Sequence, residues 1–210
     1  MSNRYRLVLF DVDSTLIEQE VIDLLASKTS HALRVAEITA KAMAGELDFD
    51  DALRERVSLL KGLPESVLTE IRREITFSPG ARELISELQK RHIRVGAVSG
   101  GFINVLQPLF KDMKLDFLLA NTLGVSNGTL TGEVMGEIVN RAVKRKSLVD
   151  FAGQFAIDLA DTVAVGDGAN DLEMIQTAGL GVSYRGKPIL NQAADVVITE
   201  PGLDQLLNFL

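Results

Sequence analysis

Two carboxylates stand close together directly after the first apolar run of the chain. Asp11 and Asp13 follow the run Leu7–Phe10 and are separated by a single residue. Carboxylates this close both ionise readily only beside a cation; otherwise one keeps a proton and can act as an acid. Either state suits phosphoryl chemistry. An isolated pair of this kind also commonly caps a helix or lies in a solvated turn, so the pair alone does not decide between these interpretations.

A second acidic cluster has the same arrangement. The apolar run Thr162–Val165 leads into a turn in which two glycines flank Asp167, and Asn170 and Asp171 follow. Glycine lets the backbone approach a ligand closely, and carboxylate oxygens are hard ligands that suit magnesium. The alternative is a helix start at which the helix dipole favours acids, although the glycines and a second acid cluster at a strand end exceed what capping requires.

Groups that could bind an anion occur in two further places. Ser99 and Gly100 follow a third apolar run, where a hydroxyl and several backbone N–H groups can meet at the start of the next helix. A tight turn is the alternative at this position. Lys144, Arg145 and Lys146 lie on a predicted helix, and any one of them could neutralise a phosphate. A basic run on a helix is also typical of a solvated face.

The elements that must position these groups alternate between strands and helices. Short apolar runs followed at once by small or acidic residues are typical of buried parallel strands. They occupy 7–10, 95–98 and 162–165, with further candidates at 117–120, 180–183 and 196–199. With helical segments between them, they predict a doubly wound, Rossmann-like α/β sheet. In such sheets ligands bind at the carboxyl ends of the strands.

Two local patterns mark turns in this arrangement. Ser78 and Pro79 are expected to be the N-cap and the first residue of the helix that carries Leu84 and Leu88. The pair Asn127–Gly128 stands between two β-prone stretches and predicts a two-residue β-hairpin. We expect this hairpin to form an accessory flap.

The stretch from residue 17 to residue 75 interrupts the alternation, because it has helical spacing and no convincing strand. We therefore expect a small helical cap at 17–75, inserted after the first strand, and a catalytic core made of 1–16 and 76–210. Arg56 falls roughly 40 to 60° from the nearest apolar positions of one cap helix, so it can point toward whatever the cap covers. Asp48 or Asp50 could cap this helix, and its apolar face comprises Leu53, Val57 and Leu60.

Composition excludes several classes of protein. The chain has 210 residues, of which 46% are hydrophobic and 24% charged, as in ordinary globular domains. Acidic residues outnumber basic ones by 29 to 22, and the resulting charge of -7 argues against nucleic-acid binding. Without cysteine the chain can form neither a disulfide nor a thiolate metal site. The apolar stretch near the N-terminus is too short for a signal peptide or a membrane span, so we expect a cytoplasmic protein.

The four chemical segments occur in the order that defines a known superfamily. D-x-D-x-T, then serine or threonine, then lysine, then G-D-x-x-x-D resembles the haloacid dehalogenase superfamily of phosphohydrolases. Within it, the chain resembles the phosphoserine phosphatase family over nearly its full length. The segments that carry this resemblance are DVDSTLIEQEVID, the helical cap with Phe49 and Arg56, VSGGF and VAVGDGANDLEMI.

The resemblance implies a role for each catalytic group. Asp11 would attack the phosphorus atom and bind one magnesium ion per chain, together with the backbone carbonyl of Asp13 and the side chain of Asp167. Asp13 would protonate the leaving serine oxygen and later deprotonate the hydrolytic water. The phosphoryl oxygens would be held by Ser99, Lys144 and the backbone N–H of Gly100.

Two further roles near the metal follow from the same resemblance. The spacing from Gly136–Glu137 favours Lys144 over Lys146 as the phosphate-binding lysine, although both remain candidates. Asn170 would reach the substrate or its phosphate. Asp171 would hold a metal-bound water or support Lys144.

Substrate choice would come from the cap. Glu20 would pair with the substrate ammonium and Arg56 would bind its carboxylate, while Met43 and Phe49 would shield the reaction from water. Without the resemblance, Glu20 and Arg56 would be interpreted as a surface pair on solvated helices.

The implied reaction is hydrolysis of O-phospho-L-serine to L-serine and phosphate, the last step of serine biosynthesis. It requires a small-molecule substrate and no nucleic-acid or membrane partner, and the chain would act as a monomer or homodimer. A related phosphatase or phosphotransferase acting on phosphohomoserine or another small phosphate ester is an alternative that the core motifs cannot separate. A response-regulator receiver also uses strand-end acids, a hydroxyl and a lysine, but its phosphate-accepting aspartate lies on a middle strand, where this chain has Ser99.

Overall fold

A single, mostly parallel sheet forms the centre of the molecule. The computed structural model describes residues 4–43 and 46–210, and within them the strand order is β4-β3-β2-β1-β5-β6-β7. Neighbouring strands pair in parallel, except β3 and β4, which are antiparallel. The strands are β1 (Leu7–Phe10), β2 (Arg94–Phe102), β3 (Phe117–Ser126), β4 (Thr129–Met135), β5 (Thr162–Gly166), β6 (Leu180–Tyr184) and β7 (Val196–Ile198).

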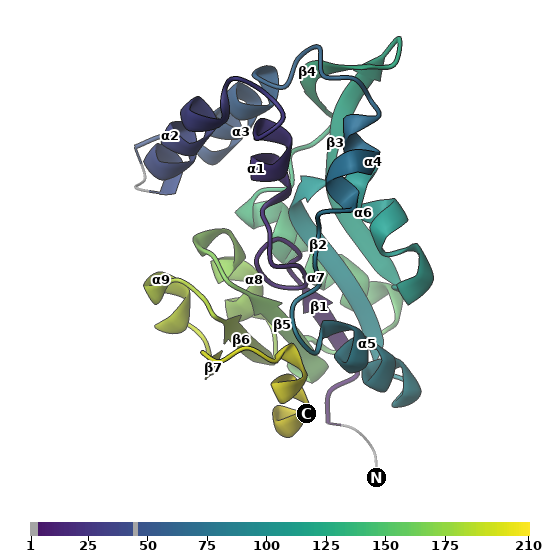
Figure 1. The fold of residues 1–210 in the computed structure, drawn as a ribbon. Helices are drawn as coiled ribbons and strands as arrows, with labels where there is room; N and C mark the ends of the chain where they lie inside the picture. Colours follow the sequence, from purple (N-terminus) through teal and green to yellow (C-terminus); the bar gives the residue numbers. More distant parts are fainter. Residues whose placement is uncertain (1–3, 44–45) are drawn as a thin grey trace.

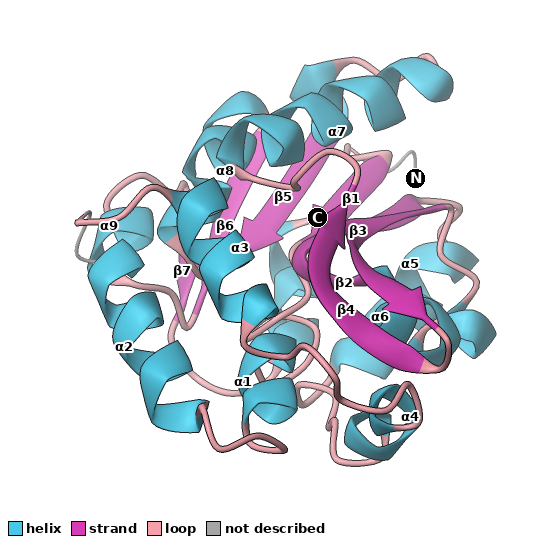
Figure 2. Ribbon diagram, turned by 90° about the horizontal axis from the view of Figure 1, so that it is seen from above, coloured by secondary structure: helices cyan, strands magenta, loops and turns pink. Residues whose placement is uncertain are grey.

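Helices cover both faces of this sheet, so the predicted doubly wound α/β fold class is confirmed. In Figure 2, α7 and α8 lie on one face, while α5 and α6 lie on the other. The α-helices are α1 (Val21–Ala26), α2 (Ala32–Met43), α3 (Phe49–Ser58), α4 (Val67–Arg72), α5 (Ala81–Lys90), α6 (Ile103–Leu109), α7 (Arg141–Gln154), α8 (Leu172–Thr177) and α9 (Pro188–Asn191). Short 3₁₀ helices are η1 (Lys111–Met113), η2 (Leu159–Asp161), η3 (Ala169–Asp171) and η4 (Leu203–Phe209).

The register of the central strands brings the chemical segments to one edge of the sheet. Every residue of β1 and β5 is buried, as expected for apolar strands covered on both faces. Phe10 of β1 pairs with Ala97 of β2 and with Val165 of β5. Asp11 therefore leaves the sheet at nearly the same level as the residues that follow Ala97 and Val165.

Helices α1 to α4 follow β1 and precede α5, and α1 to α3 lie at the end of the molecule toward which β1 and β2 point (Figure 1). Asp48, and not Asp50, is the N-cap of α3, because its side chain accepts hydrogen bonds from the backbone N–H groups of Asp50 and Asp51 at 2.9 and 3.2 Å. The predicted division into a core and a cap at residues 17 and 75 stays a prediction.

The hairpin between β3 and β4 turns at the predicted pair. Asn127 and Gly128 have φ angles of 50 and 73°, the left-handed values that a two-residue type I′ turn requires. The hairpin is bound to the segment after α3, because the N–H of Gly62 donates to the carbonyl of Leu130, and the N–H of Leu130 donates to the carbonyl of Leu63, both at 2.9 Å. Backbone hydrogen bonds thus connect this predicted flap to the segment between α3 and α4.

The expected start of α5 at Ser78 and Pro79 is wrong. The helix begins at Ala81, and its N-cap is Gly80, whose φ of 77° is left-handed. A Cβ atom on Gly80 would lie 2.1 Å from a side-chain oxygen of Asp204 in η4. The chain therefore makes a turn here that only glycine fits, and this turn delays the helix by two residues.

Candidate active site

Lys144 lies at the centre of the site and is completely buried. Its Nζ atom donates hydrogen bonds to Oδ1 of Asp11 at 2.6 Å and to Oδ1 of Asp171 at 2.7 Å. Burial alone would lower the pKa of Lys144, but attraction to Asp11 and Asp171 raises it above its ordinary value. Lys146 is exposed and pairs with Asp150 on its own helix. The structure therefore brings Lys144, and not Lys146, to the acid cluster.

The acids of the two strand-end motifs meet, as expected. Asp11, Asp167 and Asp171 each offer a carboxylate oxygen, and these oxygens lie within 4.8 Å of one another. Burial and the charge of Asp171 raise the pKa of Asp11 well above its usual range, and the same two causes raise that of Asp167 to about 7. Like charges held this close in a buried site favour a bound cation.

The donor set fits magnesium, which binds hard oxygen ligands and often uses only one or two protein carboxylates. Both oxygens of Asp171 already have partners: Oδ1 accepts from Lys144, and Oδ2 accepts from the N–H groups of Gly168 and Asp167 at 3.1 and 3.2 Å. Asp11 and Asp167 therefore have more capacity for direct coordination than Asp171, which is consistent with the expected supporting place of Asp171.

Asp13 and Ser99 form a short hydrogen bond beside this cluster. The hydroxyl of Ser99 donates to Oδ2 of Asp13 at 2.5 Å, and the N–H of Val21 donates to Oδ1 at 2.8 Å. Burial raises the pKa of Asp13, although these two hydrogen bonds oppose the shift. A carboxyl group with a raised pKa can keep a proton near neutral pH and act as a general acid.

Glu20 is held near Asp13 by a tight turn. Ser14 has a left-handed φ of 58°, and its hydroxyl donates to Oε1 of Glu20 at 2.6 Å. Water reaches Glu20, yet partial loss of its hydration and repulsion from Asp13 raise its pKa to about 7. The carboxylate can therefore gain charge stabilisation from a ligand ammonium.

Arg56 of α3 is buried, and its hydrogen-bond partners are neutral. Its Nε donates to the carbonyl of Ala52 and its Nη1 donates to the hydroxyl of Thr39, each at 3.2 Å. Burial lowers the pKa of Arg56, and the charges of Asp23 and Glu20 oppose this only through space. A buried guanidinium that meets only neutral oxygens is suited to an anionic ligand.

Three other residues were predicted to belong to the site: Phe49, Asn170 and Met43. The ring of Phe49 lies over the backbone of Gly100, since a Cβ atom on Gly100 would be 3.6 Å from Cζ of Phe49. Asn170 lies half-buried in η3, with its side-chain oxygen close to Gly168. Met43 ends α2, and its side chain lies outside the described part of the structure.

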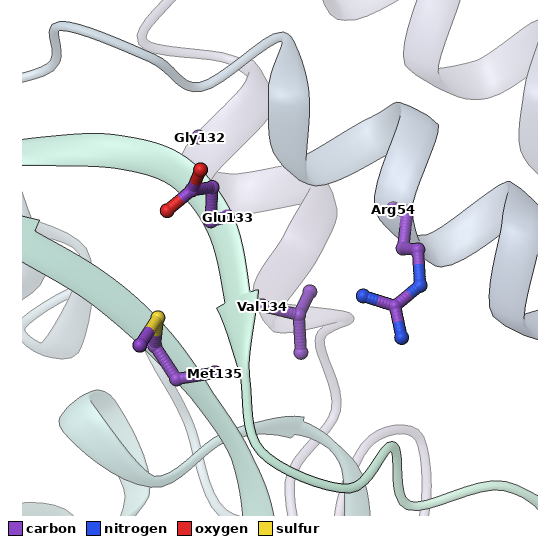
Figure 3. Close-up of a pocket in the computed structure, with 5 residues that line it drawn as sticks. All are labelled: Arg54, Gly132, Glu133, Val134 and Met135. Atoms are coloured by element: carbon purple, nitrogen blue, oxygen red, sulfur yellow. The ribbon is translucent and has the colours of Figure 1, made fainter.

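A surface pocket of about 280 Å³ opens between α3 and β4 (Figure 3). None of its lining residues belongs to the acid cluster or to the predicted site. These residues are Arg54, Gly132, Glu133, Val134 and Met135.

Two asparagines that the sequence analysis did not select also connect parts of the site. Asn140 caps α7 by accepting from the N–H of Val143, and its amide donates to the carboxylate of Asp50 at the start of α3. Asn121 is buried in β3 and bonds to two other segments. A polar residue inside the apolar run of β3 is the signal that could have identified Asn121.

Comparison with known proteins identifies the family that the sequence motifs resemble. The model of the haloacid dehalogenase-like hydrolase family matches residues 8–176. A phosphoserine phosphatase of Streptococcus thermophilus is 48% identical over 100% of this chain and 98% of its own. One of Streptomyces coelicolor is 50% identical over 98% of this chain but only 50% of its own.

A solved structure described as a phospho-aspartyl intermediate analogue of phosphoserine phosphatase superposes with a TM-score of 0.92. It is 42% identical and covers 98% of this chain and 99% of its own. The chain thus spans about half the length of some curated relatives and nearly the whole length of others. The chain belongs to the haloacid dehalogenase-like hydrolases and, within them, to the phosphoserine phosphatase family.

Proposed function

We propose that this chain hydrolyses O-phospho-L-serine to L-serine and phosphate through an aspartyl-phosphate on Asp11. The observation that carries the proposal is the position of Asp11 at the end of β1, where one oxygen accepts from buried Lys144 and the carboxylate also lies beside Asp167. Family membership and the relatives named phosphoserine phosphatase support the same reaction.

In the first half-reaction, a carboxylate oxygen of Asp11 attacks phosphorus as the bond from phosphorus to the serine oxygen breaks. Asp13 donates its proton to that serine oxygen, which leaves as a hydroxyl. In the second half-reaction, water attacks phosphorus, Asp13 takes a proton from it, and Asp11 is released as a carboxylate. Inorganic phosphate then leaves, and both aspartates return to their starting states.

Three groups would hold the phosphoryl oxygens while this occurs: the hydroxyl of Ser99, the N–H of Gly100 and the ammonium of Lys144. Magnesium, held by Asp11, Asp167 and the backbone carbonyl of Asp13, would supply positive charge against the phosphoryl group. Asn170 would contact the substrate or its phosphate. Asp171, which accepts from Lys144 at 2.7 Å, keeps that ammonium in position.

Recognition of serine would rest on the cap. Glu20 would pair with the substrate ammonium, and Arg56 would exchange its neutral partners for the substrate carboxylate. Phe49 and Met43 would exclude water from the phosphoryl group. Phosphohomoserine, which carries the same charged groups on a longer chain, is the alternative substrate. Its use by a phosphotransferase of this family would retain the same core chemistry.

The described residues include no helix that is long and apolar enough to cross a membrane. The place of the reaction at the end of serine biosynthesis, the cytoplasmic location and the monomeric or homodimeric state stay predictions.

The central test is phosphate release from O-phospho-L-serine by wild type and by Asp11→Asn. We expect wild type to turn over many times with magnesium, to stop in excess EDTA, and to recover when magnesium is restored. Asp11→Asn should lower kcat by roughly four orders of magnitude, because the nucleophile is lost. Release of about one phosphate per chain would instead indicate a receiver, and folded, magnesium-loaded wild type that releases none would contradict the proposal.

The variants Lys144→Met and Lys146→Met can show which of the two candidate lysines belongs to the site. Loss of Lys144 leaves the buried carboxylates of Asp11 and Asp171 without their cation, so we expect a loss of about 3 to 5 kcal/mol in the free energy of unfolding. Phosphatase activity should be lost as well. Lys146 forms an exposed pair, and its replacement should change stability by less than about 1 kcal/mol. Urea unfolding at neutral pH measures the change in the free energy of unfolding of each variant. Equal changes in the two variants would refute the choice of Lys144 as the lysine of the site.

Replacement of Arg56 should separate substrates that carry a carboxylate from those that do not. We expect Arg56→Met to lower kcat/KM for phosphoserine by about 100-fold or more, since a charge-assisted bidentate contact is lost. The value for p-nitrophenyl phosphate should fall less than about threefold. Arg54→Met, on an exposed position of the same helix, is the matched control. If Arg56→Met affects both substrates equally, Arg56 does not select for the carboxylate.

The raised pKa of Glu20 predicts how pH affects binding and stability. Below about pH 7 the carboxyl protonates, so KM for phosphoserine should rise as the pH is lowered from 8 to 6. KM for p-nitrophenyl phosphate should not change in the same way. A carboxyl whose pKa is raised on folding contributes stability that is full below its unfolded pKa and is lost as pH rises through its folded pKa. Glu20→Gln should therefore raise Tm at pH 8 more than at pH 5. Equal changes in Tm at both pH values would argue against a raised pKa.

A further inference from the structure

A buried amide connects the part of β2 that contains Ser99 and Gly100 with the residue that precedes the N-cap of α7, the helix of Lys144. Asn121 is 1% exposed on β3. Its Nδ2 donates to the carbonyl of Gly100 and its Oδ1 accepts from the N–H of Val139, both at 2.8 Å. These partners fix the orientation of the amide, because a carbonyl can only accept and an N–H can only donate.

The bond to Gly100 compensates for an irregularity in the sheet. Ser99 pairs with Ala120, but the next pair joins Phe102 to Asn121, so two extra residues of β2 stand opposite none of β3. Such a bulge interrupts the ladder of backbone hydrogen bonds. The side chain of Asn121 supplies the donor that the carbonyl of Gly100 would otherwise receive from a neighbouring strand.

That carbonyl belongs to the same planar peptide unit as the N–H of Gly101. The N–H of Gly101 donates to Oγ of Ser99 at 2.7 Å, and Oγ of Ser99 donates to Asp13 at 2.5 Å. A chain of hydrogen bonds thus runs from Asn121 through one rigid peptide to the hydroxyl of Ser99 and then to Asp13. The N–H of Gly101 thus occupies an acceptor site of Oγ of Ser99, whose own proton is donated to Asp13.

The other end of the amide holds the start of the lysine helix. Val139 directly precedes Asn140, the N-cap of α7, and the N–H of Lys144 donates to the carbonyl of Asn140 at 2.9 Å. One side chain therefore connects the bulge of β2 beside Ser99 with the start of α7. Both must contact the same phosphoryl group if the proposed function holds.

We propose that Asn121 is a positioning residue for phosphoryl transfer, which aligns Ser99 and, through it, Asp13 with the helix that carries Lys144. The inference rests on the proposed function for its catalytic consequence. Asn121 itself touches none of the proposed reacting groups and acts through the peptide of Gly100 and Gly101.

The test compares Asn121→Asp with Asn121→Leu. Aspartate keeps the acceptor for Val139 but places an acceptor against the carbonyl of Gly100, whereas leucine removes both bonds. We expect either change to lower kcat by about 10- to 100-fold, because misplacement of reacting groups by 1 Å has effects of this size. KM for phosphoserine should change less than about threefold, and kcat for p-nitrophenyl phosphate should fall by the same factor.

Thr162→Val is the matched control for loss of a buried hydrogen bond. Thr162 is completely buried at the start of β5, the end of the strand opposite to the acids, and its hydroxyl donates to the carbonyl of Leu159 at 2.7 Å. This variant should lower Tm but leave kcat within about twofold of wild type. An equal loss of kcat in Thr162→Val, or an unchanged kcat in both Asn121 variants, would overturn the inference.

A second measurement does not depend on turnover. Hydrogen exchange of the Gly101 amide, followed by NMR, should be faster in Asn121→Asp than in wild type, while amides of β5 remain protected. If wild type hydrolyses no ester, the proposed function fails and this measurement still decides whether Asn121 orients the peptide. Unchanged protection of the Gly101 amide would contradict that orientation.

Discussion

The buried ammonium of Lys144, held between Asp11 and Asp171, is the interaction on which the rest of the site depends. It joins α7, the end of β1 and η3, which are distant in the sequence. Burial of a charge is unfavourable unless partners compensate for the lost hydration, so each of these three groups requires the other two. The packing of α7 against the sheet is therefore set by electrostatics at its first turn as well as by apolar contacts along its length.

Much of the site could be predicted because its acids directly follow apolar strands. A buried parallel strand reads as a continuous apolar run, and the residue after it must emerge at the carboxyl edge of the sheet, which places Asp11 and Asp167 together. The sequence around Lys144 and Lys146 does not determine which of the two lysines is buried. Two residues apart on a helix they face nearly opposite ways, and only the packing of α7 decides which one enters the core. The contacts of Asn121 could not be predicted from its sequence neighbours either, because both of its hydrogen-bond partners come from other segments.

The segment between β1 and α5 illustrates which contacts local sequence patterns cannot predict. Helical spacing placed Arg56 close to the apolar positions of α3, and its side chain is buried, but its contact with Thr39 depends on how α2 packs against α3. The hairpin turn at Asn127–Gly128 was predictable because its backbone angles are local. Its attachment to residues 62–65 was not, since backbone hydrogen bonds between separate segments leave no sequence pattern. The start of α5 was misplaced for the same reason, because Gly80 is required by distant Asp204.

The charge balance of the site explains why the proposed chemistry requires a cation. Carboxylates outnumber cations here: the former are Asp11, Asp13, Asp23, Asp167, Asp171 and Glu20, and the latter are Lys144, Arg56 and Lys187. A phosphate ester adds further negative charge. Protonation could relieve the repulsion, and on Asp13 a proton would be useful in the proposed mechanism, where that residue is the acid. On Asp11 a proton would remove the nucleophile. A divalent ion held by Asp11 and Asp167, as proposed, would lower the pKa values of both carboxylates, while Asp13, proposed to offer only its backbone carbonyl, would keep its proton.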